Sequence, residues 1–410
     1  MSGLNELSVK PLLGQQVKWY QEDPLRNLFL YFVLLSVAGC TEPPPAGGNA
    51  NTDERAVLAA GSQLPQPLNV PELLTCETIA EMTPYCGYKN PEDLVHIPGT
   101  DLLIVSEMGE FMADSPGGLS LLNTSTGQRE TLTIDWSTAN ETWGESDCLL
   151  PEAAAFSPHG IDLTTRDDGE LSLLVVNHGK REAVEFFSVS QSGHLTWKGC
   201  ALPPGDPFLN DVAARRDGGF YVTHMWDKSG SFEETVEKLL AGQPTGWVWA
   251  WSPESGFLRL PHSDDLMPNG IAIDADNTTL YVNVYIGNKT FAMDLATNTR
   301  TAEITLRQPD NVSVAADGAL WVASHQHDAI GQACTQVTEG PCLLPFQIVR
   351  VDPITFKSEI VINHEGAPMG YATVALEVGN RLYLGTAHGD RVISMELEGV
   401  SSRPSIDNGN

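Results

Sequence analysis

The chain has 410 residues, of which 41% are hydrophobic and 19% charged, and its 53 Asp and Glu against 23 Lys and Arg give a formal net charge of −30. This composition excludes a disordered or collagen-like chain, and the length predicts two or three ordinary domains or one large repetitive one. An acidic surface repels phosphate backbones, which argues against nucleic-acid binding and leaves two interpretations: a solubilising charge, or an attraction for metal ions and other cations.

Leu28–Gly39 is strongly apolar but too short to span a bilayer, which needs about 20 apolar residues. The cationic residues before it are Lys10, Lys18 and Arg26. This layout is typical of an export signal. The segment runs into Val37-Ala38-Gly39-Cys40, which resembles the lipobox of bacterial lipoproteins, where the cysteine becomes the lipidated first residue of the mature chain.

The lipobox divides the N-terminal part of the chain into two predicted regions. Residues 1–39 form a signal peptide of the lipoprotein type, and residues 40–70, which open with a Pro- and Gly-rich stretch, form a flexible tether. The expected product is an exported protein, lipid-anchored through Cys40 to the bacterial cell envelope, in the periplasm or at the outer membrane, with no other membrane contact. A plain cleaved signal and a buried or interfacial helix are the alternatives.

The chain has 7 cysteines, and these remain when Cys40 is set aside: Cys76, Cys86, Cys148, Cys200, Cys334 and Cys342. An even number in an exported chain indicates disulfides. Six cysteines allow about 15 pairings, and the sequence does not choose among them. Short loops favour Cys76–Cys86 and Cys334–Cys342, which leaves Cys148–Cys200, and free buried thiols are the alternative. The sequence has no CxxC motif and no Cys/His spacing typical of structural zinc.

Apolar runs rich in strand-forming residues dominate the rest of the sequence, whereas helical periodicity is scarce and clearest at Phe232–Leu240. Most of these runs follow a Gly, Asp or Asn turn, and six share one form: Leu102–Val105, Leu173–Val176, Phe220–Val222, Leu280–Val282, Leu320–Val322 and Leu382–Leu384. Strand–turn–strand units that recur every ~40–70 residues indicate the blades of a propeller. The predicted fold is therefore all-β, a six-bladed β-propeller over residues 71–400 with a tail at 401–410.

A polar residue stands about ten residues or slightly more before each apolar run, in contexts that favour turns. Because the innermost strand of each propeller blade lies along the central axis, equivalent positions in different blades converge at one end of the channel. The residues at this offset are Glu92, His159, Asn210, Asn269, Asp310, Asn311 and, before the last run, Thr373. Any one of them alone is more often a turn residue, but their repetition at one offset predicts a ring of side chains.

Carboxylate and amide oxygens dominate this ring, and they are hard ligands that suit Ca²⁺, which takes about 6–8 oxygens in flexible geometry. Two carboxylates with several amides nearly neutralise such an ion without excess repulsion. Zinc would require more His or Cys, and magnesium would require fewer protein ligands. The propeller is therefore expected to have a central calcium-binding channel.

Six short segments carry these residues, in this order: Glu92-Asp93-Leu94, Ser157–Ile161, Leu174–His178, Asn210-Asp211-Val212, Pro268–Ile271 and Asp310–Val314. Together they resemble the paraoxonase/arylesterase family over roughly Glu92 to Val314. Each motif alone is weak, but the neighbouring gluconolactonase and strictosidine-synthase-like families lack the His-Gly and Asn-His pairs in this arrangement. The resemblance implies a six-bladed propeller with two calcium ions that hydrolyses lactones, with aryl esters and organophosphates as side activities.

The resemblance also implies a position for each ion. The catalytic ion would be held by Glu92, Asn210, Asn269, Asp310 and Asn311. The structural ion would be held by Asp93, Asp211 and the backbone carbonyl of Ile161.

Two departures from the family are visible. The tail at 401–410 has no cysteine for the family's long disulfide, so ring closure must be secured differently, and the expected lipid anchor replaces the family's retained apolar N-terminus.

Calcium would act as a Lewis acid on the lactone carbonyl, and a general base must then activate water. His159 is the leading candidate for this base because imidazole titrates near neutral pH, and His178 would orient it or shuttle the proton. A structural histidine at a strand end is the alternative for His178. His325 and Thr373 are predicted to line the substrate pocket. The sequence has no G-x-S-x-G elbow of a serine hydrolase.

The predicted function is a calcium-dependent hydrolase of lactones and aryl esters, whose partners are small-molecule substrates and not nucleic acids. One alternative is a sugar-lactone hydrolase of the gluconolactonase type. Another is a non-catalytic, surface-exposed propeller that binds a partner and uses calcium only structurally. The inserted loops contain these aromatic residues: Phe111, Trp143, Trp226, Trp247 and Trp249. One interpretation is that they form an apolar mouth for acyl lactones, and the other is that they belong to blade cores and rims.

Overall fold

The computed structural model describes residues 74–110, 115–137, 143–327, 334, 337 and 341–397. The predicted signal peptide, the tether and the tail at 401–410 lie outside these residues, as does Phe111. The helices in the described part include none that is both long and apolar enough to cross a membrane. The described residues all belong to one structural unit, Gln66–Asn410.

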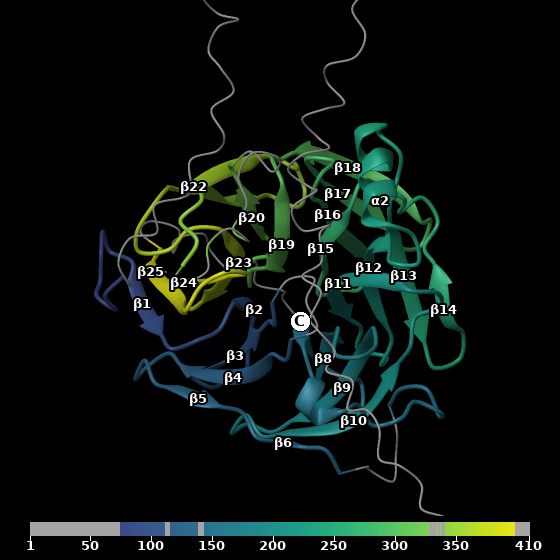
Figure 1. The fold of residues 1–410 in the computed structure, drawn as a ribbon, viewed down its shortest axis with the longest axis horizontal. Coiled ribbons are helices and arrows are strands. Elements are labelled where there is room, and N and C mark those ends of the chain that lie inside the picture. Colours follow the sequence, from purple (N-terminus) through teal and green to yellow (C-terminus); the bar gives the residue numbers. More distant parts are fainter. Residues whose placement is uncertain are drawn as a thin grey trace, which may run out of the picture. The chain divides into compact units, whose positions relative to one another are not determined.

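Six sheets form this unit, and within each sheet the successive strands pair antiparallel (Figure 1). The first sheet contains β2 (Pro91–His96), β3 (Leu102–Glu107), β4 (Gly118–Asn123) and β5 (Arg129–Thr131). The second contains β7 (Pro158–Thr165), β8 (Leu171–Asn177), β9 (Ala183–Val189) and β10 (Leu195–Ala201), with β6 (Ile134–Asp135) parallel to β10. The third contains β11 (Pro207–Ala214), β12 (Phe220–Asp227), β13 (Trp247–Ser252) and β14 (Gly256–Arg259).

The remaining sheets repeat the same order from the innermost to the outermost strand. The fourth contains β15 (Pro268–Ile273), β16 (Thr279–Val284), β17 (Lys289–Asp294) and β18 (Thr299–Thr305). The fifth contains β19 (Pro309–Val314), β20 (Leu320–His325), β21 (Phe346–Val351) and β22 (Ser358–His364). The sixth contains β23 (Ala372–Val378), β24 (Arg381–Thr386), β25 (Arg391–Glu396) and β1 (Thr83–Cys86). The described helical segments are η1 (Ala153–Ala155) and α2 (Phe232–Leu240).

The first strands of the sheets contact one another in sequence order, and the last contacts the first. These innermost strands are β2, β7, β11, β15, β19 and β23, and Figure 1 shows the six sheets arranged as blades around them. The ring is therefore closed, and the prediction of an all-β, six-bladed β-propeller is confirmed.

The closure of the ring joins the two ends of the described chain. β1 pairs antiparallel with β25, with Thr83 opposite Ser394, so that the N-terminal strand completes the last blade. Arg391 on β25 is 1% exposed and donates hydrogen bonds to the carbonyl oxygens of Leu74 and Thr75 at 3.0 and 3.2 Å. Backbone pairing and this buried arginine therefore close the ring without a disulfide to the tail.

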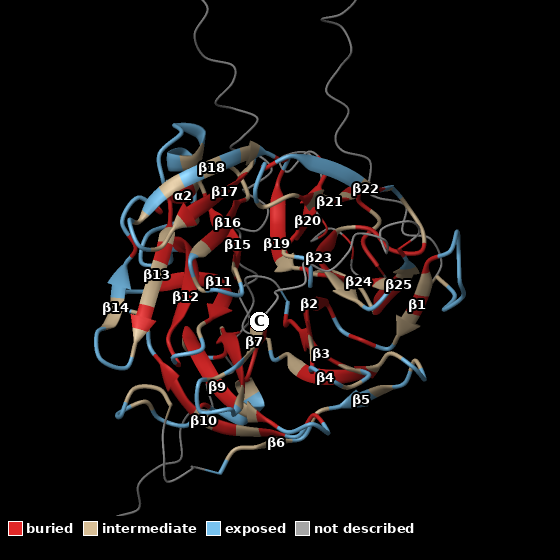
Figure 2. Ribbon diagram, turned by 180° about the vertical axis from the view of Figure 1, so that it is seen from behind, coloured by how far each residue is buried: buried red, intermediate tan, exposed pale blue. Residues whose placement is uncertain are grey.

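The apolar runs that the sequence shows are the second strands of the blades. In β3, for example, every residue from Leu103 to Glu107 is buried. Because each blade packs between two neighbours, both faces of its second strand are covered, and this produces a continuous apolar run rather than an alternating one. The outermost strands β5, β14, β18 and β22 are largely exposed (Figure 2).

The cysteines form three disulfides, Cys76–Cys86, Cys148–Cys200 and Cys334–Cys342, so the prediction of disulfides is confirmed, and the pairs are those that the short loops favour. The predicted helix is α2, with the predicted bounds. It begins with a capping box, in which the Ser231 hydroxyl accepts the amide of Glu234 and the Glu234 side chain accepts the amide of Ser231.

Candidate functional site

Every innermost strand breaks its pairing register, on β11 at the middle of the strand and on the others near its start, and it does so at the residues that the sequence marks. On β2, for example, Pro91 pairs with Glu107 and Asp93 with Ser106, which leaves Glu92 without a partner. The unpaired positions in the six blades are Glu92, His159-Gly160, Asn210-Asp211, Asn269-Gly270, Asp310-Asn311 and Thr373. A bulge releases a residue from the ladder and re-aims its side chain, so six aligned bulges form the ring of side chains.

Glycine at two of these bulges reflects the close approach of neighbouring inner strands. A Cβ on Gly160 would lie 2.5 Å from the Cα of Asp211, and a Cβ on Gly270 would lie 2.3 Å from the carbonyl oxygen of Asp310. Real Cβ atoms do not approach backbone so closely, so the His-Gly and Asn-Gly pairs of the sequence are required by the packing of one blade against the next.

The five residues assigned to the first ion are all buried and all lie at bulges: Glu92, Asn210, Asn269, Asp310 and Asn311. The side-chain amide of Asn311 donates to Oε1 of Glu92 at 2.8 Å across the ring. Four oxygen atoms of this set are buried and have no hydrogen-bond partner: Oε2 of Glu92 and Oδ1 of Asn210, Asn269 and Asn311. A buried polar atom without a partner costs free energy, so each of these oxygens fits a ligand position.

The electrostatics of the ring favour a bound cation. Burial raises the pKa of Glu92 well above its usual range, and the charges of Asp93, Asp310 and Asp211 raise it further. Burial likewise raises the pKa of Asp310 to about 8 and that of Asp93 to about 7. No Lys or Arg of the described part forms an ion pair with these carboxylates to offset their repulsion.

Oxygen donors from carboxylates and amides, crowded and partly unpartnered, fit a hard divalent cation such as Ca²⁺. The described residues contain no group of three or more His, Cys, Asp or Glu side chains that could hold a metal ion. A cation at this position would therefore depend on the Asn amide oxygens as well as on Glu92 and Asp310.

The residues predicted to hold the structural ion differ from those of the first set, because their carboxylates already accept hydrogen bonds from backbone amides. Asp93 accepts the amide of Leu94 at 2.8 Å and, from the next blade, the amide of Ile161 at 2.7 Å. Asp211 likewise accepts the amides of Val212 and Ile271, each at 2.8 Å. The structure thus shows these carboxylates linking each blade to its neighbour, and their calcium-binding role stays a prediction.

His159 and His178 form a hydrogen-bonded pair, with 2.8 Å between Nδ1 of His159 and Nε2 of His178. The other ring nitrogen of His159, Nε2, lies 3.7 Å from Oε1 of Glu92. Burial lowers the pKa of His159 well below its usual range, and the neighbouring His178 lowers it further. His159 is therefore a neutral imidazole beside the ring of oxygen donors, as a general base requires.

An apolar flank lies beside this pair. Phe208 stacks on His178 with ring centroids 4.5 Å apart and on Trp226 with centroids 4.3 Å apart. Met225 and Met267 complete a buried cluster here, against which Phe232 of α2 packs. Trp226 thus lies near the candidate site, whereas Trp143 and Trp249 pack against the cluster between the second and third blades.

Polar residues that the sequence analysis missed hold the backbone at the bulges. Ser106 on β3 donates to the carbonyl of His159 at 2.5 Å, and Thr223 on β12 donates to the carbonyl of Asn269 at 2.6 Å. Asn283 on β16 donates in the same way to the carbonyl of Asp310. Each of these residues directly follows an apolar run, and this position was the signal that could have identified them.

His325 and Thr373 are buried rather than exposed in a cavity wall. His325 is 0% exposed and donates from Nε2 to the carbonyl of Ala372 at 3.0 Å, while its Nδ1 lies 2.9 Å from the hydroxyl of Tyr285. Thr373 donates to the carbonyl of Glu92 at 2.6 Å. Both side chains thus hold the backbone of inner strands, and their predicted contact with substrate stays a prediction.

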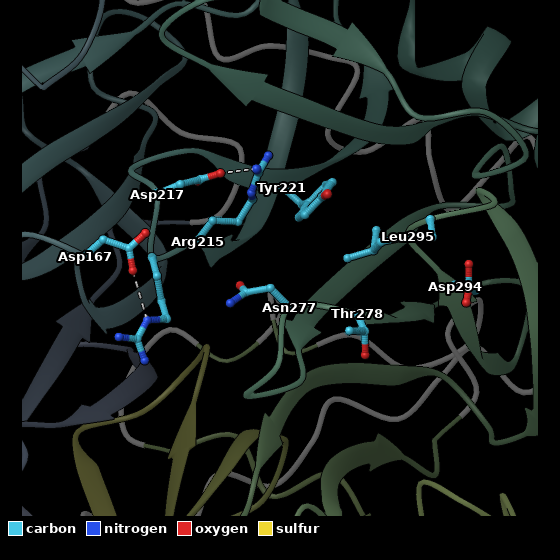
Figure 3. A pocket seen from close by; sticks show the side chains of 10 residues that line it. Asp167, Arg215, Asp217, Tyr221, Asn277, Thr278, Asp294 and Leu295 are labelled. Carbon is cyan, nitrogen blue, oxygen red and sulfur yellow. Dashed lines mark hydrogen bonds and ion pairs between the residues drawn. The ribbon is translucent and has the colours of Figure 1, made fainter.

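A separate hollow of about 590 Å³ is lined by residues of the turns after β7, β11 and β15, together with Tyr221 on β12 and residues 294–296 at the end of β17 (Figure 3). Its charged residues are largely paired with one another: Arg215 with Asp217, and Arg216 with Asp167 at 3.3 Å. None of the residues predicted for the site lines it.

Comparison with known proteins identifies the family. The family model described as Arylesterase matches residues 86–396, which is most of the chain. The chain belongs to the arylesterase family. It is 27% identical over 247 residues to serum paraoxonase/arylesterase 1 of Mus musculus, and the match covers 57% of this chain and 67% of the mouse protein.

Two further similarities belong to the same comparison. Serum paraoxonase/arylesterase 1 of Homo sapiens is 28% identical over 184 residues, covering 42% of this chain and 50% of the human protein. A solved gluconolactonase from Xanthomonas campestris has 16% sequence identity and a TM-score of 0.45, covering 77% of this chain and 89% of that chain. The predicted resemblance to the paraoxonase/arylesterase family is thus confirmed, and at the level of the family this arylesterase-family chain is a hydrolase of ester bonds.

Proposed function

We propose that this arylesterase-family protein is a calcium-dependent hydrolase of lactones and aryl esters, with its site at the six bulges. The observation that carries the proposal is the set of four buried oxygens without hydrogen-bond partners, on Glu92, Asn210, Asn269 and Asn311. Together with Asp310 they would hold a catalytic Ca²⁺. When bound, the ion supplies the Lewis acid that polarises the ester carbonyl. A second, structural ion is proposed at Asp93, Asp211 and the carbonyl of Ile161.

The protein's own contribution to the chemistry is proton transfer. The neutral ring of His159 accepts a proton from the attacking water at Nε2, the nitrogen that faces the ring of oxygens. His178, 2.8 Å from Nδ1 of His159, receives or orients the proton on the far side. Because His159 is 3% exposed, bulk water does not solvate the base, and the transfer takes place in a low-dielectric surrounding.

The apolar flank favours aryl and acyl substrates over polar sugar lactones. Phe208 and Trp226 are buried and stacked beside His178, so this side of the proposed site is apolar and suits hydrocarbon groups better than sugar hydroxyls. We therefore propose acyl lactones and aryl esters as the substrate class. Turnover of gluconolactone with no turnover of an acyl lactone would contradict this choice.

The decisive experiment assays an acyl lactone, gluconolactone and phenyl acetate with Ca²⁺, after removal of metal with EDTA, and after Ca²⁺ is restored. The proposal predicts hydrolysis that chelation abolishes and Ca²⁺ restores. His159→Gln should lower kcat by about 100-fold or more, within the range for a general base, while Ca²⁺ still raises the melting temperature of the variant. Full activity in chelator, or no turnover of any substrate by the wild type, would refute the proposal.

We also propose that the protein is exported and lipid-anchored through Cys40. The apolar segment before Cys40 and the three disulfide pairs support this proposal, because disulfides persist in oxidising compartments. Incorporation of labelled palmitate into the wild type, and its loss in Cys40→Ser, is the expected result. Equal label in both proteins would contradict the anchor.

A further inference from the structure

Glu182 is a buried carboxylate on the far side of the histidine pair. It directly precedes β9, and its side chain is 5% exposed. Its two oxygens lie 3.0 and 2.9 Å from Nδ1 of His178, whose other nitrogen meets His159. The three side chains therefore form one hydrogen-bonded chain that ends beside the ring of oxygen donors.

Two further groups hold this carboxylate in place. Nζ of Lys228 lies 2.6 Å from Oε1 of Glu182, and the amide of Leu209, the residue before Asn210, donates to Oε2 at 3.2 Å. Burial raises the pKa of Glu182, but the charges and hydrogen bonds of His178 and Lys228 outweigh burial, so the pKa lies below its usual value. Glu182 therefore stays ionised near neutral pH and can only accept hydrogen bonds.

An acceptor at this position determines where the protons of both imidazoles lie. Because Glu182 cannot donate, Nδ1 of His178 must carry hydrogen, and in the neutral ring its Nε2 is then an acceptor. The hydrogen of the histidine pair consequently lies on Nδ1 of His159. This leaves Nε2 of His159 unprotonated on the side of Glu92.

We propose that Glu182 is a positioning residue that fixes the orientation and tautomer of His178 and, through it, presents the unprotonated Nε2 of His159 to the attacking water. This inference rests on the proposed function in which His159 is the base. It also assigns to this chain a third member of the relay, which the sequence analysis did not identify.

The relay conserves every proton and bond. Water gives one proton to Nε2 of His159 while its oxygen bonds to the ester carbonyl carbon, and the hydrogen on Nδ1 of His159 passes to Nε2 of His178. The resulting imidazolium of His178 is stabilised by the carboxylate of Glu182. When the ester C–O bond breaks, the proton returns along the same path to the leaving alkoxide oxygen.

The test compares Glu182→Ala and Glu182→Gln, with Asp206→Asn as the matched control. The amide oxygen of Gln can still accept from Nδ1 of His178, whereas Ala cannot. Asp206 is the other carboxylate near Lys228, at 3.7 Å, and no contact joins it to His178. Glu182→Ala should lower kcat by about 10- to 100-fold with KM changed less than about 2-fold, and Glu182→Gln should recover much of the loss. Asp206→Asn should match the wild type.

Nitrogen-15 NMR of the His178 ring, assigned by comparison with His178→Gln, gives a readout that does not depend on turnover. The wild type and Glu182→Gln should show hydrogen on Nδ1, and Glu182→Ala should show a shifted tautomer population. Wild-type kcat together with an unchanged tautomer in Glu182→Ala would overturn the inference. If Glu182→Ala fails to fold, Glu182→Leu, which fills the site but cannot accept a hydrogen bond, is judged by the same two criteria. If the wild type hydrolyses no ester, the proposed function fails, and the NMR result still decides whether Glu182 positions His178.

Discussion

The amide oxygen of Asn269 is buried at the bulge of β15 without a hydrogen-bond partner. We expect Asn269→Ala to weaken Ca²⁺ binding by about 10-fold or more, because it removes one ligand from a set that includes only two carboxylates. The measurement is isothermal titration of the metal-free protein with Ca²⁺. Asn277→Ala, at a half-buried position in the turn after β15 of the same blade, is the control and should bind as the wild type does. Equal affinities for all three proteins would exclude Asn269 as a ligand.

Calcium affinity should also depend on pH through the carboxylates of the ring. Burial raises the pKa of Asp310 to about 8, so this group takes up a proton as the pH falls through that value. The raised pKa also makes the metal-free fold less stable as the pH rises from about 4 towards 8. In this range the carboxyl group is ionised in the unfolded chain but still protonated in the folded protein. Below about pH 8, Ca²⁺ must displace the proton from Asp310 in order to bind. If one proton is released for each ion bound, the Ca²⁺ affinity should fall by about 10-fold for each pH unit. Affinity that is flat between about pH 8 and pH 6 would contradict this.

At the level of single residues, the sequence identified the side chains of the ring better than it identified the polar residues that hold the bulges in place. Glu92 and Asn269 stand about ten residues before an apolar run, and each lies at the bulge of an inner strand. The repeated offset in the sequence therefore predicted that these residues meet in one ring. Ser106 and Thr223 also stand at a fixed place, directly after an apolar run, but this signal is weaker because a polar residue near a strand end has many uses. Glu182 joins His178 across a short loop, and only the fold shows that its carboxylate faces the ring nitrogen.

At the scale of the strand, the bulges depend on the close approach of inner strands. Gly270→Ala would place a Cβ 2.3 Å from the carbonyl oxygen of Asp310 on the neighbouring strand. Because that neighbour is backbone and also carries a proposed ligand, the strand must shift, and we expect a loss of about 1–3 kcal/mol in the free energy of unfolding. Chemical denaturation with and without Ca²⁺ measures the loss.

The matched control for this substitution is Gly118→Ala on β4, where an added Cβ meets no atom within 4 Å. It should change the free energy of unfolding by less than about 0.5 kcal/mol. A similar effect from both substitutions would mean that close packing at the bulge does not limit the fold.

The strands themselves were predictable to different degrees. Second strands such as β8 and β20 are buried on both faces, so their apolar runs stand out in the sequence. Outermost strands such as β18 alternate between exposed and half-buried residues and contain few apolar side chains, so their bounds follow only from pairing with the strand before them. The number of blades was therefore predictable from the second strands alone.

At the scale of the whole molecule, the sequence predicted only that something other than a disulfide to the tail closes the ring of blades. Pairing of β1 with β25 brings together residues separated by most of the chain, and no local pattern in Thr83–Cys86 indicates this partner. Closure matters for the proposed site because its ligands come from different blades. An open ring would leave Glu92 on the first blade without a fixed position relative to Thr373 on the last, which donates to its carbonyl.

Arg391 provides a direct test of how much closure contributes to stability. Its guanidinium donates to the carbonyls of Leu74 and Thr75 and to the carboxylate of Asp390, and a lysine cannot reproduce this planar set of donors. We expect Arg391→Lys to lower the free energy of unfolding by about 1–3 kcal/mol, because the ammonium group at this buried position cannot donate to all three acceptors. The control is Arg381→Lys on the same blade, whose ion pair with Glu396 is partly exposed and should contribute less than about 1 kcal/mol. If denaturant unfolding shows equal effects for the two variants, the buried arginine is not what secures the ring, and the backbone pairing of β1 with β25 closes it alone.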